Sequence, residues 1–485
     1  MEIWDDATAL TAAIRDKRVS SAELLDALLA RVDEHNPAIN AVVARDVDRA
    51  REQARAADAA TAAGESWGPL HGLPMTIKDS IETEGLTTTS GAPELRDHVP
   101  ARDASAVARL KAAGAIVFGK TNLPLYAGDL QSYNDVYGTT NNPWDLGRTP
   151  GGSSGGAVAA LATGMTPLEL GSDIGGSIRI PASFTGVAGI KPSYGVVPVR
   201  GHIPGPPGTL GRPDIATLGP LARSVRDLSL ALDVLVGPED DDARAWSIAL
   251  PPPRAVGNDL RVRVLLDHDH LFTSSAVRGT LSAAIDRLAD SGVKVEAADG
   301  TAAELIGEGA AMAMGMIGAV TVAGMPDESF EFLCSMAAAE PTPGEPPLMA
   351  ALRTMTSRHR RWLHLDEQRH QLRSRWAAWF EDVDALLAPA CGVPAFPHQH
   401  DGQPTMRTLD VDGQTVPYFQ NGWSTAFGLV YLPAACVPAG LTPEGLPVGL
   451  QVVAPYLEDN TALAGAALVE ERLGGFVPPP AFAGG

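Results

Sequence analysis

The chain has 485 residues, of which 45% are hydrophobic and 20% are charged, an ordinary globular composition. Glycine and proline are too few for a fibrous or low-complexity protein, and a chain of this length buries enough surface to fold without disulfides. The net charge of −21 would repel a phosphate backbone, so nucleic-acid binding is disfavoured. The acidic run at 239–242 is interpreted as a solvated loop, since it lacks the alternating ligands of a calcium loop.

Cysteine usage and hydropathy bear on the compartment and on cofactors. The cysteines Cys334, Cys391 and Cys436 are widely spaced, which indicates reduced thiols rather than a disulfide framework or a zinc site. The N-terminus shows no apolar run of signal-peptide length, and no stretch of 18 apolar residues predicts a membrane span. We expect a cytoplasmic protein without membrane contact, metal or cofactor.

Predicted helices and strands alternate along the chain. The capping box Ser20–Glu23 opens an apolar-periodic helix, and a short apolar run ends at Lys78. The other predicted helices cover 45–63, 104–113, 157–163, 275–291, 348–380 (one long amphipathic helix) and 460–473, and the other predicted strands cover 115–118, 168–170, 260–266, 293–297, 384–388, 431–437 and 446–453. This alternation predicts one α/β domain over residues 1–485 with a largely buried sheet.

Two familiar catalytic patterns occur in contexts that disfavour them. Residues 114–121 match the G-x4-G-K-[ST] phosphate loop, but a helix precedes them and their bulky apolar middle suits a buried strand. The G-x-S-x-G pattern at 151–156 fits Ser153 and Ser154, as in an α/β-hydrolase esterase. The residues before it predict a loop rather than the required strand, and no histidine stands in a partner motif. The esterase interpretation is kept as a distant alternative.

A third arrangement combines Lys78 with the two serine clusters. A serine that attacks an amide must lose its proton, and without a histidine the natural base is a neutral lysine. Leu73, Met75 and Ile77 surround Lys78 with apolar groups, which would lower the pKa of the lysine. The Gly-Gly-Ser turn ending at Ser177 lets backbone N–H groups converge, as an oxyanion hole requires. Taken singly, each feature also fits a surface strand end or a close-packed turn.

Together these segments resemble the amidase signature family in order and spacing. The similarity runs from Gly72-Leu-Pro-Met-Thr-Ile-Lys78-Asp79 through Gly119-Lys-Thr-Asn122 and Asn142-Pro-Trp-Asp-Leu-Gly-Arg-Thr-Pro-Gly-Gly-Ser-Ser-Gly-Gly156 to Gly171-Ser-Asp-Ile-Gly-Gly-Ser-Ile-Arg-Ile-Pro181 and Gly189-Ile-Lys-Pro192. The close match covers about 120 residues. The resemblance implies a large, twisted, mixed sheet of about ten or eleven strands with helices on both faces, and a signature core at about 70–195.

The resemblance also implies roles for individual residues. Ser177 matches the acylated nucleophile, Ser153 the bridging serine that relatives hold on a cis peptide, and Lys78 the base. The backbone N–H groups of Ile174, Gly175, Gly176 and Ser177 match the oxyanion hole. Residues that match supporting positions are Ser154, Asp173 and Arg179.

The family resemblance implies a hydrolase of carboxamide C–N bonds that acts through a Ser-cisSer-Lys relay and an acyl-enzyme. Anilides or small apolar amides are the expected substrates, as in an aryl acylamidase, with carbamates (urethanes) and esters as further candidates. The alternative is the glutaminase (A) subunit of a tRNA-dependent amidotransferase. The segment after the signature, 204–218, lacks the Ser-Ser-Leu-Asp-Gln pattern that is usual in that subunit. A homodimer is one assembly compatible with the sequence.

The substrate-facing region is predicted at about 300–380, which is helical and rich in methionine. Seven of the eleven methionines fall between Met312 and Met355. One interpretation is a core in which methionine fills gaps; the other is an apolar lid over Ser177, with 341–347 as a moving loop. Leu125 stands where many relatives carry a glutamate, which also suggests an apolar pocket. The pocket residues predicted on this basis are Leu125, Met312, Met316, Met325 and Met336.

Overall fold

The centre of the fold is one mixed sheet, seen in the computed structural model, which describes residues 3–203, 205–340 and 347–484. Within these residues eleven strands hydrogen-bond in the order β1-β3-β2-β6-β8-β7-β14-β15-β11-β9-β10. They are β1 (Val42–Arg45), β2 (Pro74–Lys78), β3 (Ile116–Thr121), β6 (Leu168–Asp173), β7 (Ala188–Lys191), β8 (Thr217–Ala222), β9 (Val262–Val264), β10 (Val295–Ala297), β11 (Ala385–Pro389), β14 (Ala434–Leu441) and β15 (Pro447–Val453). Two small hairpins lie outside this sheet: β4 (Tyr133–Asn134) with β5 (Gly138–Thr139), and β12 (Thr408–Val411) with β13 (Gln414–Pro417).

The strand directions divide the sheet into two parallel groups and an antiparallel middle, with one antiparallel strand at an edge. Strands β3, β2 and β6 run parallel, β11, β9 and β10 run parallel at the other end, and the pairs between β6 and β11 are antiparallel, as is the pair of the edge strand β1 with β3. Side chains alternate between the two faces, as a pleated strand requires. In β11, Ala385 and Leu387 join the core on one face, whereas Leu386 and Ala388 join the core on the other.

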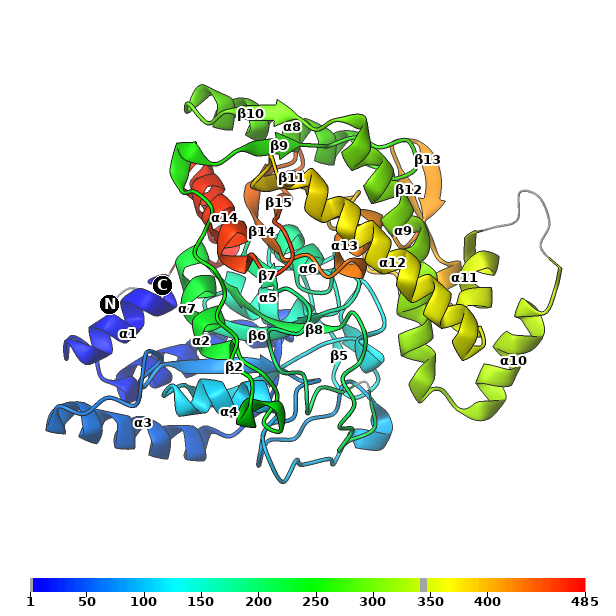
Figure 1. Ribbon diagram of the computed structural model, residues 1–485. Helices are drawn as coiled ribbons and strands as arrows, with labels where there is room; N and C mark the ends of the chain where they lie inside the picture. Colours follow the sequence, from blue (N-terminus) through cyan, green and yellow to red (C-terminus); the bar gives the residue numbers. More distant parts are fainter. Residues whose placement is uncertain (1–2, 204, 341–346, 485) are drawn as a thin grey trace.

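Helices cover both faces of the sheet (Figure 1). The core on one face takes side chains from α2 (Ser21–Ile39), α3 (Val47–Ala63), α4 (Ser105–Ala112), α7 (Val225–Leu235), α8 (Ser275–Asp290) and α14 (Asp459–Leu473), with α1 (Ala7–Arg15) beside α7. On the other face lie α5 (Gly155–Ala162), α6 (Arg179–Thr185), α9 (Gly300–Thr321), α12 (His359–Trp379) and α13 (Gly422–Leu429). The α/β fold with a large mixed sheet of eleven strands is thus confirmed.

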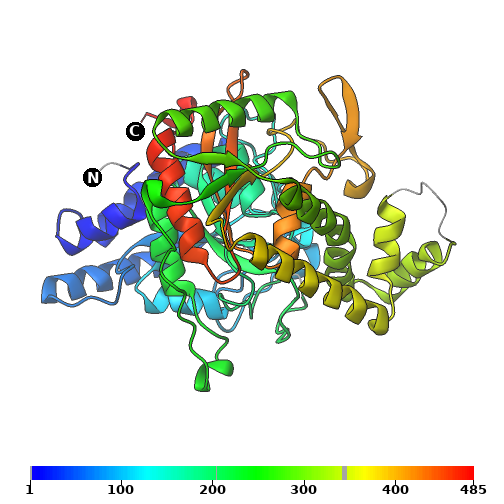
Figure 2. The ribbon, with the colours of Figure 1, turned by 45° about the horizontal axis from the view of Figure 1, so that its top comes forward.

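Helices α10 (Asp327–Ala337) and α11 (Pro347–Met355) and the C-terminal end of α9 extend away from the sheet and the helices that cover it. Helix α11 lies beside α9, helix α10 packs on α11, and both views show the two helices projecting from the sheet (Figures 1 and 2). No residue of α10 is buried, and Phe332 on it is 64% exposed. The loop predicted to move, 341–347, lies outside the described residues, apart from Pro347 at the start of α11.

One expectation about the helical region was wrong. The single helix expected over 348–380 is two, α11 and α12, because the chain turns at Thr356 and Ser357 and becomes extended at Arg358. Serine and threonine hydroxyls compete for backbone hydrogen bonds, and the Thr356 hydroxyl donates back to the Leu352 carbonyl.

By length and composition, one helix in the described residues is apolar enough to cross a membrane. It spans Gly300–Gly324 and has a mean hydropathy of 1.6 in its most apolar window, 39% of which is buried in the fold. Glu304 and Glu308 interrupt the apolar run, which is why the sequence did not reveal it. Packed core helices show the same composition, and α9 contacts α11, α12 and α13. Absence of membrane contact stays a prediction, as does the cytoplasmic location.

Candidate active site

A long buried segment of the chain has one small opening. From Thr149 to Ser193 every residue is buried except Ile174, Gly175 and Ser177. The segment includes β6, β7, α5 and α6, so the opening is a turn between a central strand and a helix, held on all sides. A substrate can therefore reach the predicted nucleophile and the backbone of two neighbouring residues, while the rest of the segment is shielded from water.

Lys78 ends β2 and points to the face of the sheet that carries α5. In the alternating pattern of the strand, Met75 and Ile77 join the core on the other face. The Lys78 Nζ donates hydrogen bonds to the hydroxyls of Ser153 at 2.7 Å, Ser154 at 3.0 Å and Ser172 at 3.0 Å. The structure thus brings the predicted base to the predicted bridging serine, although the two are 75 positions apart.

Burial favours the uncharged form of Lys78, which is the form that can act as a base. Desolvation lowers the pKa of Lys78 to about 7, against the opposing attraction of the Asp173 and Glu169 carboxylates. At neutral pH a substantial fraction of the amine is therefore unprotonated and free to accept a proton. Leu73, Met75 and Ile77 are fully buried, but Met75 and Ile77 lie on the other face of the sheet, so Lys78 is desolvated by the buried segments around Ser153 and Ser172 rather than by these two side chains.

The bridging serine follows a cis peptide bond. The bond between Gly152 and Ser153 is cis, as the resemblance implied. Ser132 holds the loop that contains this bond, since its hydroxyl donates to the Gly151 carbonyl and accepts from the Gly155 N–H, both at 3.0 Å. The Ser154 N–H donates to the Ser177 carbonyl at 3.2 Å, which places the two serine segments side by side.

A buried ion pair shapes the turn that carries Ser177. Arg179 donates to both Asp173 carboxylate oxygens at 2.9 and 3.1 Å, and neither side chain is exposed. Burial would raise the pKa of Asp173, but Arg179 and the N–H of Ile178 bring it down to about 2. The pair is therefore charged at any working pH. It acts as a brace, which agrees with the supporting role expected of these two residues.

The same carboxylate changes the expectation for Gly176. Its N–H donates to Asp173 Oδ1 at 2.8 Å, so this donor is used inside the turn and is not available to an oxyanion. A φ of +109° and a Cβ that would lie 2.6 Å from Ile180 Cδ1 explain why only glycine fits there. We accordingly reduce the predicted oxyanion donors to Ile174, Gly175 and Ser177, the three residues of the opening.

Ser172 was missed by sequence analysis. Its hydroxyl is the third acceptor for Lys78 and it is 4% exposed. A serine near the end of a strand is common, so the sequence carried no signal that separates it from an ordinary core position. Its place one residue before Asp173, on the strand beside β2, is what brings it to the lysine.

The predicted pocket residues separate into two groups. Met312 and Met316 of α9 pack in one apolar cluster with Ile174, and Met316 is 1% exposed. Met325 follows the short turn at the end of α9, Met336 is 39% exposed on α10, and Leu125 is 49% exposed. Only the first two share an apolar cluster with an oxyanion residue; Leu125 and Met336 are exposed, and Met325 lies in the connection between α9 and α10.

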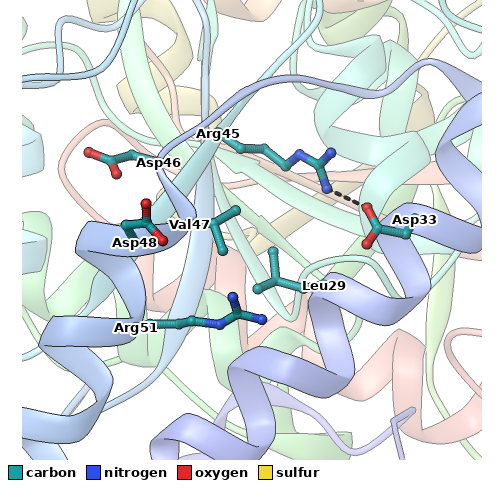
Figure 3. A pocket seen from close by; sticks show the side chains of 7 residues that line it. All are labelled: Leu29, Asp33, Arg45, Asp46, Val47, Asp48 and Arg51. Atoms are coloured by element: carbon teal, nitrogen blue, oxygen red, sulfur yellow. Dashed lines mark hydrogen bonds and ion pairs between the residues drawn. The ribbon is translucent and has the colours of Figure 1, made fainter.

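The two disfavoured motifs are accounted for. Residues 119–121 of the phosphate-loop pattern belong to β3, a fully buried strand between β1 and β2. The G-x-S-x-G segment follows a loop rather than a strand, as predicted. A surface pocket between α2, β1 and α3 is lined by charged side chains, and Arg45 there donates to Asp33 at 2.7 Å (Figure 3). None of its elements carries a predicted site residue.

Comparison with known proteins agrees with the geometry. A family model described as Amidase matches residues 23–463. A curated relative, the A subunit of the glutamyl-tRNA(Gln) amidotransferase of Roseiflexus sp. (strain RS-1), is 34% identical over 93% of this chain and 93% of its own. Of the solved structures, one from a vestigial protein complex linked to the origins of an s-triazine catabolic enzyme is 30% identical (TM-score 0.79; 98% and 100% of the two chains covered). A bacterial aryl acylamidase is 25% identical (TM-score 0.79; 99% of each chain).

Proposed function

The chain belongs to the amidase family and is a hydrolase of C–N bonds, and we propose that its substrates are uncharged amides, with anilides, small apolar amides and aryl carbamates as the preferred class. The observation that supports the chemistry is the opening at Ile174, Gly175 and Ser177 in an otherwise buried segment, with Lys78 bonded to Ser153 behind it. Esters are accepted by the same mechanism.

The proposed mechanism is a proton relay through one lysine and two serines. Neutral Lys78 takes a proton from Ser153, which takes one from Ser177 as the Ser177 oxygen attacks the carbonyl carbon. The N–H groups of the opening stabilise the tetrahedral oxyanion. The proton then returns through Ser153 to the leaving nitrogen, the C–N bond breaks, and an acyl-enzyme remains. Water attacks the ester of Ser177 by the same relay and releases the acid.

The preference for uncharged substrates rests on the wall beside the opening. Ile174 packs with Met312, Met316 and Ile317, whereas a Cβ on Gly175 would first meet the Asn421 amide and then Thr425 and Ile317. The wall is thus apolar on the Ile174 side, and the buried Arg369 is already paired with an aspartate, Asp214. Apolar groups next to the scissile bond would gain from this contact, whereas a charged group would lose its hydration there.

A second candidate function is the glutaminase subunit of a tRNA-dependent amidotransferase. The names of curated relatives favour it directly, because relatives from Roseiflexus and Synechococcus that are 32–34% identical over more than nine tenths of this chain are named as that subunit. In that case glutamine would be the substrate and the protein would work with partner subunits. The comparisons support this alternative better than they support an anilide.

A substrate panel separates the two candidates. The full chain is assayed alone on an anilide, an aliphatic amide, an aryl carbamate and glutamine, and glutamine is assayed again with amidotransferase partner subunits. Faster turnover of the anilide or carbamate than of glutamine in both settings supports our proposal. Glutamine hydrolysis that exceeds all others, or that appears with the partner subunits, would overturn it. A chelator is the control and should leave every rate unchanged.

A further inference from the structure

Tyr431 has a backbone conformation that a bulky side chain rarely adopts. It follows α13, and its φ of +71° lies in the left-handed region that glycine favours. The turn is closed by its N–H, which donates to the Gly428 carbonyl at 3.0 Å. A residue in such a conformation persists when its surroundings hold it there, and these positions gather at functional sites. The contacts of the Tyr431 ring and hydroxyl are therefore informative.

The Tyr431 side chain is fixed on three sides. Its hydroxyl donates to Asp214 Oδ1 at 2.5 Å, its ring stacks on Tyr194 with centroids 4.4 Å apart, and the Arg369 guanidinium lies 4.5 Å from the ring centroid. The guanidinium of Arg373, on the same helix as Arg369, lies 5.4 Å from that centroid. The side chain is 7% exposed, so it forms part of the interior.

Arg369 joins this group to the helical region. It lies on α12, its side chain is 3% exposed, and its Nη1 donates to Asp214 Oδ2 at 2.6 Å, while Nη2 donates to Asp366. Asp214 therefore accepts from Arg369 with one oxygen and from Tyr431 with the other. Removing one partner from such a buried pair leaves the other charge without compensation. We call Asp214, Arg369 and Tyr431 the latch.

The latch lies against the opening of the active site. Tyr431 packs in one cluster with Met316 of α9 and with Ile174. At the other end of the turn, a Cβ on Gly428 would lie 3.6 Å from the Ile174 carbonyl oxygen and 3.5 Å from Arg179. The turn that carries Tyr431 thus lies close to the oxyanion segment. The latch connects that segment to α12, and through the shared cluster to α9.

We propose that the latch positions α9 and α12 against Ile174 and so determines how well the site holds a bulky apolar group next to the scissile bond. Asp214, Arg369 and Tyr431 are positioning residues, since none of them belongs to the relay. The inference rests on the proposed function for its substrate class, but it is stated for any reagent that acylates or sulfonylates Ser177.

The test compares two sulfonyl fluorides that differ in one group. Phenylmethanesulfonyl fluoride and methanesulfonyl fluoride react with the full chain, the second-order rate constants are measured by mass spectrometry of the Ser177 adduct, and their ratio is taken. The variants are Arg369→Met, which keeps length but removes the charge, and Tyr431→Phe, which keeps the ring but removes the hydroxyl. Arg375→Met is the matched control, because Arg375 also joins α12 to α9, through exposed ion pairs with Glu304 and Glu308.

We expect the phenyl-to-methyl ratio to fall about tenfold in Arg369→Met and less in Tyr431→Phe, and to stay at the wild-type value in Arg375→Met. The rate with the methyl reagent stays within about twofold of wild type in every variant. Equal losses with both reagents, in step with a lower melting temperature, would overturn the proposal, and so would an unchanged ratio in a folded Arg369→Met. If wild-type Ser177 reacts but anilides are not hydrolysed, the proposed substrate class fails while the ratio still decides the role of the latch.

Discussion

At the scale of single residues, the proposed chemistry depends on the contacts of one lysine and on the exposure of one serine. Lys78 makes three hydrogen bonds to serine hydroxyls, and Ser177 is one of three residues that open to solvent in a buried segment. Ser153 and Ser154 both accept a hydrogen bond from Lys78 and both are fully buried, and Ser154 stands directly before α5. Two predictions belong to this scale, one about the nucleophile and one about the base.

The nucleophile prediction distinguishes three serines. A fluorophosphonate should label wild-type protein at Ser177, because this serine alone among the three is partly exposed. Ser177→Ala should abolish both labelling and hydrolysis. Peptide mapping by mass spectrometry gives the answer. A label on Ser153 or Ser154 would contradict the relay and revive the G-x-S-x-G interpretation, while Ser329→Ala, at an exposed serine on α10, is the control that should be labelled normally.

The base prediction concerns the pH profile. Because burial lowers the pKa of Lys78 to about 7, the acylation rate should be low below pH 6, rise through about pH 7, and then level off as the amine loses its proton. Lys78→Ala should lose several orders of magnitude in kcat, and Lys78→Arg should not restore it, since arginine keeps its proton.

Glu169→Gln is the informative companion variant. The Glu169 carboxylate raises the pKa of Lys78, so its removal should move the midpoint of the pH profile to lower pH. The rise of the acylation rate with pH should remain, because Lys78 is still the group that loses a proton. Pre-steady-state burst rates across pH 5–10 test both statements. A profile that keeps its acid limb in Lys78→Ala would contradict the assignment of the base.

At the scale of elements, helices and strands differ in how clearly the sequence indicated them. The capping box at Ser20 and Glu23 is present as predicted, and α8 and α14 begin and end within one residue of their predicted bounds. Strand β3 extends past the predicted end at Phe118 to Thr121, because pairing with β1 and β2 overrides the weak strand preference of glycine and lysine. Local pattern could not show that pairing.

The methionine prediction belongs to these elements. Met316→Ala in the wall beside Ile174 should lower the rate with aryl substrates about tenfold more than with small aliphatic amides, about 1.4 kcal/mol of discrimination. Met336→Ala on α10 is its control and should change neither rate, since that side chain is largely exposed. Steady-state kcat/KM on an anilide and on an aliphatic amide gives the comparison. Equal losses on both substrates for Met316→Ala, together with a lower Tm, would show a packing role only.

For the whole molecule, the sequence predicted the class of fold and the family; the catalytic roles of Lys78, Ser153 and Ser177 stay predictions, and the sequence did not indicate their surroundings. The segments around Lys78, Ser153 and Ser177 have fixed spacing, so their resemblance carried the site. Ser172, the role of the Gly176 N–H and the conformation of Tyr431 depend on contacts between distant segments, and no local pattern encodes them. The same holds for Asp214 and Arg369, which are 155 positions apart.

The opening at Ile174, Gly175 and Ser177 has a further consequence for how such proteins diversify. It offers a substrate mostly backbone atoms and one hydroxyl, which can distinguish a carbonyl from other groups but not one acyl chain from another. Under the proposed function, discrimination between acyl chains therefore falls to segments outside 149–193, above all to α9 and α12. An exchange of that helical region between two relatives, with its Asp214 contact retained, would transfer substrate preference while leaving the bond-breaking machinery untouched.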